Sequence, residues 1–314
     1  MGRIAATLRQ GVATRRADKN EGRQGPRQRT GMTERQATTG MSGALARAAL
    51  VVLAALLPAA LVPHSTPETG QVLLLIGLFA GAVVVAEYAS PYPALIEFRF
   101  APPYNRTRFA LLAVTALALA LIQRGQTIDG PLSLLIAGLA DLCGAALNLP
   151  FSPVRLLLGA LPSDLDPASL LLVRNGAGLA LALAGLTLGG VALAMRFNLW
   201  PMGQGPFNVW INLPTFDPTA GNDVVERLLR QGRTNIVLGF LTPALLPGLV
   251  MALGLMAQPV DFTAPMIYVW GIALWAFLPT ALIMRGLAMG RVARMIRANR
   301  RRLADGDTAA YAPA

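Results

Sequence analysis

Charged residues are scarce in this chain. Only 14% of its 314 residues are Asp, Glu, Lys or Arg, against roughly 25% in ordinary soluble domains, and 54% are hydrophobic. A soluble globule of this length needs more polar side chains to cover its surface. The mean hydropathy of +0.52 argues against a disordered chain, and Gly and Pro lack the period of a collagen. The class that remains is a multi-pass membrane protein.

Cysteine and histidine are each present once. Cys143 has no second cysteine for a disulfide or a CxxC pair, and His64 lies in a short polar segment that we expect to be a solvated loop. Histidine-based metal sites, Ser-His-Asp triads and bis-histidine haem ligation are therefore hard to build. The sequence contains no Walker loop, GxSxG, HExxH, CxxCH or kinase motif. We expect no enzyme, catalytic residue, metal or cofactor.

Positive charge is concentrated at the two ends. The net charge is +11, with nine basic and three acidic residues in positions 1–40 and seven arginines after Met284. Nucleic-acid binding is the first explanation for such charge. However, basic ends beside apolar spans are what orientation in a bacterial membrane requires, so we expect no nucleic acid. The abundance of Arg, Ala and Gly is typical of a G+C-rich bacterial gene.

The pattern divides the chain into three regions. Residues 1–40 are polar without an apolar period and are expected to be disordered. Residues 41–288 form the transmembrane helical domain, and residues 289–314 form a basic cytoplasmic tail. The central region holds seven apolar runs: Gly43–Val62, Gly70–Ala86, Phe109–Gln123, Pro131–Leu149, Ala168–Met195, Asn235–Ala257 and Ala264–Met284. We interpret the first run as an uncleaved span rather than a signal peptide, because no clean cleavage site follows it.

The distribution of arginine between the loops predicts six crossings. Loops 90–108 and 197–234 are both basic, so both belong on the cytoplasmic face, which requires an even number of crossings between them. Segment 131–161 is the weakest span because it contains Asp141 and a break at Pro150 and Pro153. We therefore predict an all-α bundle in the bacterial inner membrane, with six crossing helices, a non-crossing helical hairpin and both termini cytoplasmic. Seven or eight crossings are the alternatives.

Asp141 is the most unusual polar residue. A carboxylate among leucines and alanines is costly in a membrane, so it should face a partner, the bundle interior or water. Arg174 and Asn175 are the candidate partners, and together the three form a candidate intramembrane polar site. The group is either an ion or proton site or a structural ion pair.

Small residues and prolines mark two further features. Gly178, Gly185 and Gly189 predict a face on which a neighbouring helix packs closely, within the chain or between subunits. Pro243 and Pro247 interrupt the sixth run and free backbone carbonyls. Such a break can mark a substrate path in a transporter, and elsewhere it is a plain kink.

Two loops rich in aromatic residues, proline and arginine form the candidate docking surface. They span residues 90–108 and 197–221 and lie on the same predicted face. Their candidate docking residues are Tyr92, Phe98, Arg99, Tyr104, Trp200, Phe207, Trp210 and Phe216.

The leading functional hypothesis is a non-enzymatic inner-membrane protein that binds or scaffolds another membrane or cytoplasmic component through these loops. Its expected partners are membrane lipids and such a protein. The alternative is a transporter of an ion or small solute, with Asp141 and the Pro243–Pro247 break on the path. An intramembrane enzyme acting on lipid is disfavoured, because spacing places no second catalytic group beside Glu87 or Asp141.

Overall fold

The computed structural model describes residues 26–63, 65–90, 94–201, 207, 209–217, 223–254 and 264–310. Within these residues the chain is helical and contains no strand, which confirms the predicted all-α class. Six helices have more than 20 residues: α2 (Pro26–Leu61), α3 (Pro67–Ala89), α4 (Tyr104–Arg124), α7 (Pro167–Arg196), α9 (Val224–Gly254) and α10 (Pro265–Ala310). Three are shorter: α5 (Pro131–Leu147), α6 (Pro153–Gly159) and α8 (Val209–Asn212).

Three of these helices begin with the same local device. A polar residue caps the helix and a proline follows at its first position, as in Thr66 before α3, Ser152 before α6 and Asp166 before α7. The cap side chain accepts an amide hydrogen bond three residues later, and proline suits a position whose own amide has no helical partner. The hydrogen bond from Ser169 also holds the pKa of the Asp166 carboxyl below its ordinary value.

Five described helices are long and apolar enough to cross a membrane: Met41–Leu61, Pro67–Ala89, Tyr104–Arg124, Pro167–Arg196 and Pro265–Ala304. The predicted sixth crossing, in α9, is not among them. The side chains of residues 250, 251, 253 and 254, at the end of α9, lie outside the described part. Segment 131–161 forms the 17-residue α5 and the seven-residue α6, and neither is long enough for this group.

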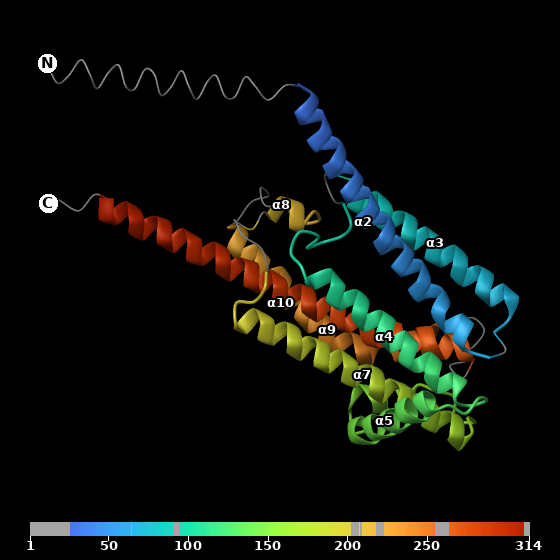
Figure 1. Ribbon diagram of the computed structural model, residues 1–314. Coiled ribbons are helices and arrows are strands. Elements are labelled where there is room, and N and C mark those ends of the chain that lie inside the picture. Colours follow the sequence, from blue (N-terminus) through green and yellow to red (C-terminus); the bar gives the residue numbers. More distant parts are fainter. Residues whose placement is uncertain are drawn as a thin grey trace, which may run out of the picture.

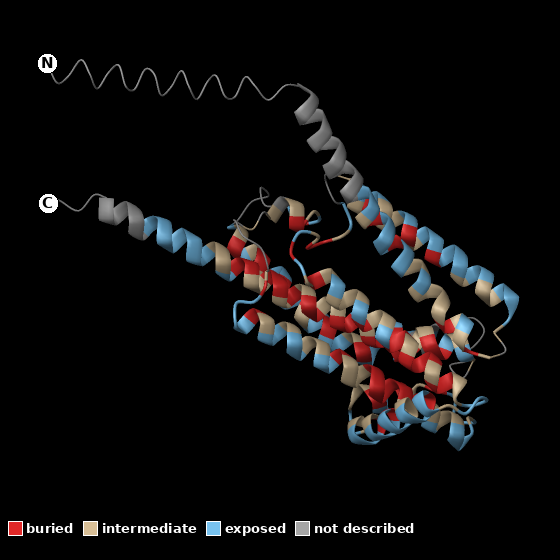
Figure 2. Cartoon of the chain, viewed as in Figure 1, coloured by how far each residue is buried: buried red, intermediate tan, exposed pale blue. Residues whose placement is uncertain are grey.

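The bundle is organised around α10. Helices α4, α7 and α9 pack along it, while α2 and α3 form a pair at one side (Figure 1). Helices α5 and α6 pack against α7, and α6 also contacts α9. Buried residues gather along α10 and the facing parts of α4 and α7, whereas α3 and α5 are largely exposed (Figure 2). Broad apolar exposure of this kind is what a lipid-facing surface requires.

Helices extend past the expected domain boundaries. Residues 26–40 belong to α2, although the sequence assigns them to the disordered segment, and residues 1–25 lie outside the described part. Likewise, α10 continues through residue 289 without a break, and Met289 and Val292 are buried. Adding a residue to an existing helix is far easier than nucleating a new one. A helix that forms in an apolar span can therefore continue into the polar residues next to it.

Glycines allow α9 and α10 to approach closely in antiparallel orientation. A Cβ on Gly286 would lie 2.5 Å from the Gly232 carbonyl oxygen and 2.6 Å from Ile236 Cγ1. One on Gly239 would lie 2.5 Å from Ile283 Cγ1. Such distances leave no room for even a methyl group, so the two backbones touch at these positions.

Gly286→Ala tests this contact. The added methyl group meets backbone, and overpacking of this kind typically lowers the free energy of unfolding by about 1–3 kcal/mol. The matched control is Gly248→Ala in α9, where nothing lies within 4 Å of the added Cβ. In thermal unfolding of the detergent-solubilised protein, Gly286→Ala should melt lower than wild type and Gly248→Ala should not. Equal melting temperatures for the two variants would contradict the close contact.

Candidate functional site

The two aromatic loops pack against each other at one end of the bundle. Their described parts, 94–103, 197–201, 207 and 209–217, are called the loop platform. The Phe98 amide donates to the Asn212 carbonyl (2.6 Å), and the Phe100 amide donates to Asn212 Oδ1 (3.1 Å). Trp200 Nε1–H donates to the Ala101 carbonyl (3.0 Å). This contact agrees with an even number of crossings between the loops.

Several candidate docking residues are buried in the platform or at the adjoining start of α4. Phe98, Tyr104, Trp200 and Phe216 are each at most 3% exposed. The Phe98 ring centroid lies 4.5 Å from that of Tyr104 and 5.6 Å from that of Trp200. Buried rings cannot reach a partner, so the structure corrects their expected place on a docking surface. Their burial holds the two loops together instead.

Arg99 is also engaged by contacts within the protein. Its guanidinium donates to the Glu87 carbonyl and lies over the rings of Tyr88 and Phe100, and desolvation lowers its pKa. The Glu87 carboxylate accepts hydrogen bonds from the amides of residues 94–96. Both groups therefore shape the chain where it leaves α3.

Three candidate docking residues remain. Phe207 is half-buried, with its ring centroid 6.5 Å from that of Phe98. Tyr92 lies outside the described residues. The backbone of Trp210 belongs to α8, but its side chain is outside the described part.

Glu97 joins the platform to α10. Its carboxylate accepts two hydrogen bonds from Arg285, at 2.6 and 2.7 Å, and one from the Thr215 hydroxyl at 2.8 Å. The Glu97 and Arg285 side chains are 11% and 27% exposed. Sequence reasoning missed this pair because its members are 188 positions apart and neither segment carries a motif that marks it.

Glu97→Gln tests this connection. The variant leaves Arg285 without a countercharge, and losing one partner of a largely buried charged hydrogen bond costs about 1–3 kcal/mol. Arg300→Gln is the control, because its pair with Asp223 is 56% and 40% exposed and exposed pairs contribute little. Thermal unfolding should show a clear loss for Glu97→Gln only. Similar melting curves for the two variants would remove this role from Glu97.

Asp141, Arg174 and Asn175 lie together, from α5 and α7. Arg174 Nη2 donates to Asp141 Oδ1 at 2.6 Å and Arg174 Nε donates to Asn175 Oδ1 at 2.9 Å. Asn175 Nδ2 reaches the same Asp141 oxygen at 3.3 Å. The Asp141 side chain is 58% exposed, so this cluster sits on the outside of the bundle and its carboxylate is paired.

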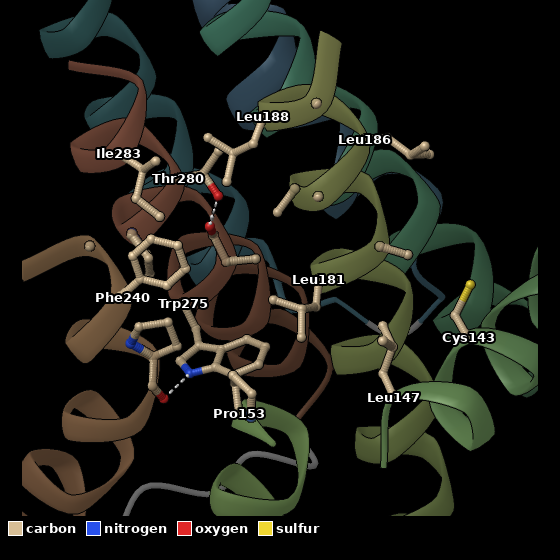
Figure 3. Close-up of a pocket in the computed structure, with 18 of the residues that line it drawn as sticks. Cys143, Leu147, Pro153, Leu181, Leu186, Leu188, Phe240, Trp275, Thr280 and Ile283 are labelled. Atoms are coloured by element: carbon tan, nitrogen blue, oxygen red, sulfur yellow. Dashed lines mark hydrogen bonds between the residues drawn. The ribbon is translucent and has the colours of Figure 1, made fainter. Parts of the chain in front are cut away.

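An apolar groove of about 990 Å³ lies between α7 and α9, with α10 as its floor. Figure 3 shows the side chains around this space, among them Leu181, Phe240 and Trp275. Residues of α5 and α6, such as Cys143 and Pro153, complete the lining. No charged side chain lines the groove in the described part of the chain, so it suits a hydrocarbon surface.

A carbonyl freed by the proline break in α9 finds a hydrogen-bond donor inside the groove. Pro247 has no amide hydrogen, so it cannot bond the carbonyl of Pro243 four residues earlier. Trp275 Nε1–H donates to that carbonyl at 2.9 Å (Figure 3). The Thr280 hydroxyl is likewise occupied, since it donates to the Ala276 carbonyl at 2.7 Å. The carbonyl freed by Pro247 is therefore no open ligand for a passing ion.

The predicted packing glycines of α7 divide into two groups. A Cβ on Gly178 would lie 2.5 Å from the Gly144 backbone, so α5 and α7 meet there. Gly185 and Gly189 line the groove, and nothing lies within 4 Å of a Cβ added to either. One of the three glycines is therefore covered by the chain itself, and the other two are open.

The chain matches no protein-family model, no curated protein and no solved structure.

Proposed function

We propose that this chain is a six-crossing protein of a bacterial inner membrane, with both termini in the cytoplasm. The crossings are the five apolar helices together with α9. The platform end of the bundle carries most of the arginines that flank or join the apolar spans, among them Arg99, Arg106 and Arg196. The opposite end carries three aspartates beside two arginines: Asp129, Asp164, Asp166, Arg124 and Arg155. This asymmetry supports a cytoplasmic platform, because arginine is retained on the cytoplasmic side.

Cysteine accessibility tests this orientation. With Cys143 replaced by Ala, single cysteines are introduced at the exposed positions Arg294 and Asp164. A membrane-impermeant maleimide should label Asp164→Cys in intact spheroplasts and Arg294→Cys only after permeabilisation. Labelling of Arg294→Cys in intact spheroplasts would reverse the orientation.

The proposed activity is non-enzymatic: the protein holds a transmembrane helix of another chain in the groove between α7 and α9. The observation that carries this proposal is the open glycine face of Gly185 and Gly189, set in an apolar groove in which the Pro243 carbonyl and the Thr280 hydroxyl are already hydrogen-bonded. In a membrane, helices associate where small residues let backbones approach, because burying apolar side chains away from lipid gains little. An acyl chain needs no such face.

The proposed binding site thus lies within the membrane, whereas the sequence predicted it on the loops. The candidate aromatic residues of the platform are mainly buried. The proposal therefore remains a non-enzymatic binding protein, but its binding site is the groove and not the loops. The transporter alternative receives no support from this geometry. Asp141 is paired on the outside of α5 and does not line the groove, and the carbonyl freed by Pro247 is bonded to Trp275.

Filling the groove tests the proposal. A photo-crosslinking residue at Leu186, which lines the groove and is 73% exposed, should give a discrete protein adduct in cells. Gly185→Leu adds a side chain where nothing lies within 4 Å, so it should preserve the fold and abolish the adduct. Gly138→Leu is the matched control, since that position is equally open but lies outside the groove.

Two results would overturn the proposal. One is crosslinking to lipid alone in the wild-type background. The other is an adduct that survives Gly185→Leu as well as it survives Gly138→Leu. An adduct with twice the mass of the chain supports the proposal and identifies the inserted helix as that of a second copy.

A further inference from the structure

A second hollow, separate from the groove, lies between α6 and α7 and has a volume of about 460 Å³. Two arginines from different helices line it, Arg155 of α6 and Arg174 of α7. The rest of the lining is mainly apolar, with Leu158, Leu170 and Leu171. The hollow therefore combines cationic groups with a hydrocarbon surface.

The charge in this hollow is only partly balanced. Arg174 gives Nη2 to Asp141 and Nε to Asn175, which leaves its Nη1 available. Arg155 is exposed and forms none of the ion pairs found among the described residues. Asp166, at the start of α7, accepts the amide of Ser169 and does not line the hollow. Two guanidinium groups against one carboxylate leave a net charge of about one positive unit, since Arg is always protonated.

The depth of the hollow matches a lipid headgroup. Arg174 lies seven residues after Pro167, which at about 1.5 Å per residue is roughly 10 Å along α7 from its first turn. The polar region of one leaflet is about 5–8 Å thick, so arginines at this depth lie near the boundary between headgroups and acyl chains. Long arginine side chains reach from this boundary toward phosphate oxygens while their stems contact hydrocarbon.

We propose that this hollow binds the phosphate of an anionic phospholipid in the outer leaflet. Arg155 and Arg174 donate to the phosphate oxygens, and the three leucines contact the glycerol and the upper acyl chain. Guanidinium groups are suited to this role because their planar donors match phosphate geometry. The inference is independent of the groove, but its assignment to the outer leaflet rests on the proposed orientation, which the cysteine labelling tests separately. Free phosphate shares this chemistry, so the experiment compares the two sources.

The experiment is a calorimetric titration of the purified full-length protein, in a neutral detergent, with dihexanoyl-phosphatidylglycerol. We expect saturable binding with one high-affinity site. Arg155→Gln should weaken this binding by about tenfold, the usual effect of losing one charge-assisted hydrogen bond. Arg124→Gln is the matched control. It removes the same charge at the same end of the bundle, but Arg124 does not line the hollow.

A steric variant keeps the test independent of charge. Gly159→Leu adds a side chain at the edge of the hollow, where nothing lies within 4 Å of the new Cβ. It should weaken lipid binding while both arginines remain. Helical circular dichroism and the size-exclusion profile should match wild type for Gly159→Leu and Arg155→Gln. If either variant misfolds, the other still decides the outcome.

The other binding results either overturn or support the proposed site. Equal affinity of wild type and Arg155→Gln, or an equal loss in Arg124→Gln, overturns the site. Equal binding of dihexanoyl-phosphatidylcholine overturns the requirement for an anionic headgroup. Inorganic phosphate that binds as tightly as the lipid overturns the assignment to a lipid. Selective binding of the phosphatidylglycerol that Arg155→Gln and Gly159→Leu both weaken supports the proposal.

Discussion

Close contact between helix backbones is the interaction on which this bundle depends. Inside a membrane, lipid tails are as apolar as leucine, so apolar side chains alone give helices little reason to associate. Contacts at Gly232, Gly239 and Gly286 bring α9 and α10 together, and Gly144 and Gly178 do the same for α5 and α7. With α9 and α7 both placed on α10, the groove between them follows from the arrangement.

The platform end is held by a different kind of interaction. Where the chain meets water, burying aromatic side chains stabilises the fold. At this end, Phe98, Tyr104 and Trp200 form a cluster that joins two loops distant in sequence. Glu97 and Arg285 add a paired charge between the platform and α10. The aromatic residues that look like a docking surface in the sequence are thus used to close one end of the bundle.

The two proposed binding sites differ in what they offer. The groove offers hydrocarbon and an open glycine face, and its freed carbonyl is taken by Trp275. The hollow beside α6 offers two guanidinium groups beside leucines. We propose a helix of another chain for the first and a phosphate-bearing lipid for the second, so the two proposals concern separate places on the protein.

Composition and hydropathy by themselves determined the helical class, the positions of the apolar runs and the weakness of segment 131–161 as a span. These are local properties, because a helix in lipid must bond its own backbone wherever an apolar run is long enough. The arginine pattern also predicted that the two loops lie at the same end of the bundle, because both are basic. Only the tertiary structure decided which glycines touch, that Phe98 and Trp200 are buried, and that Glu97 pairs with Arg285. Gly178 and Gly185 have the same sequence signature, yet one contacts α5 and the other faces an open groove. Sequence periodicity places a residue on a helix face, but the occupant of that face depends on how the other helices pack.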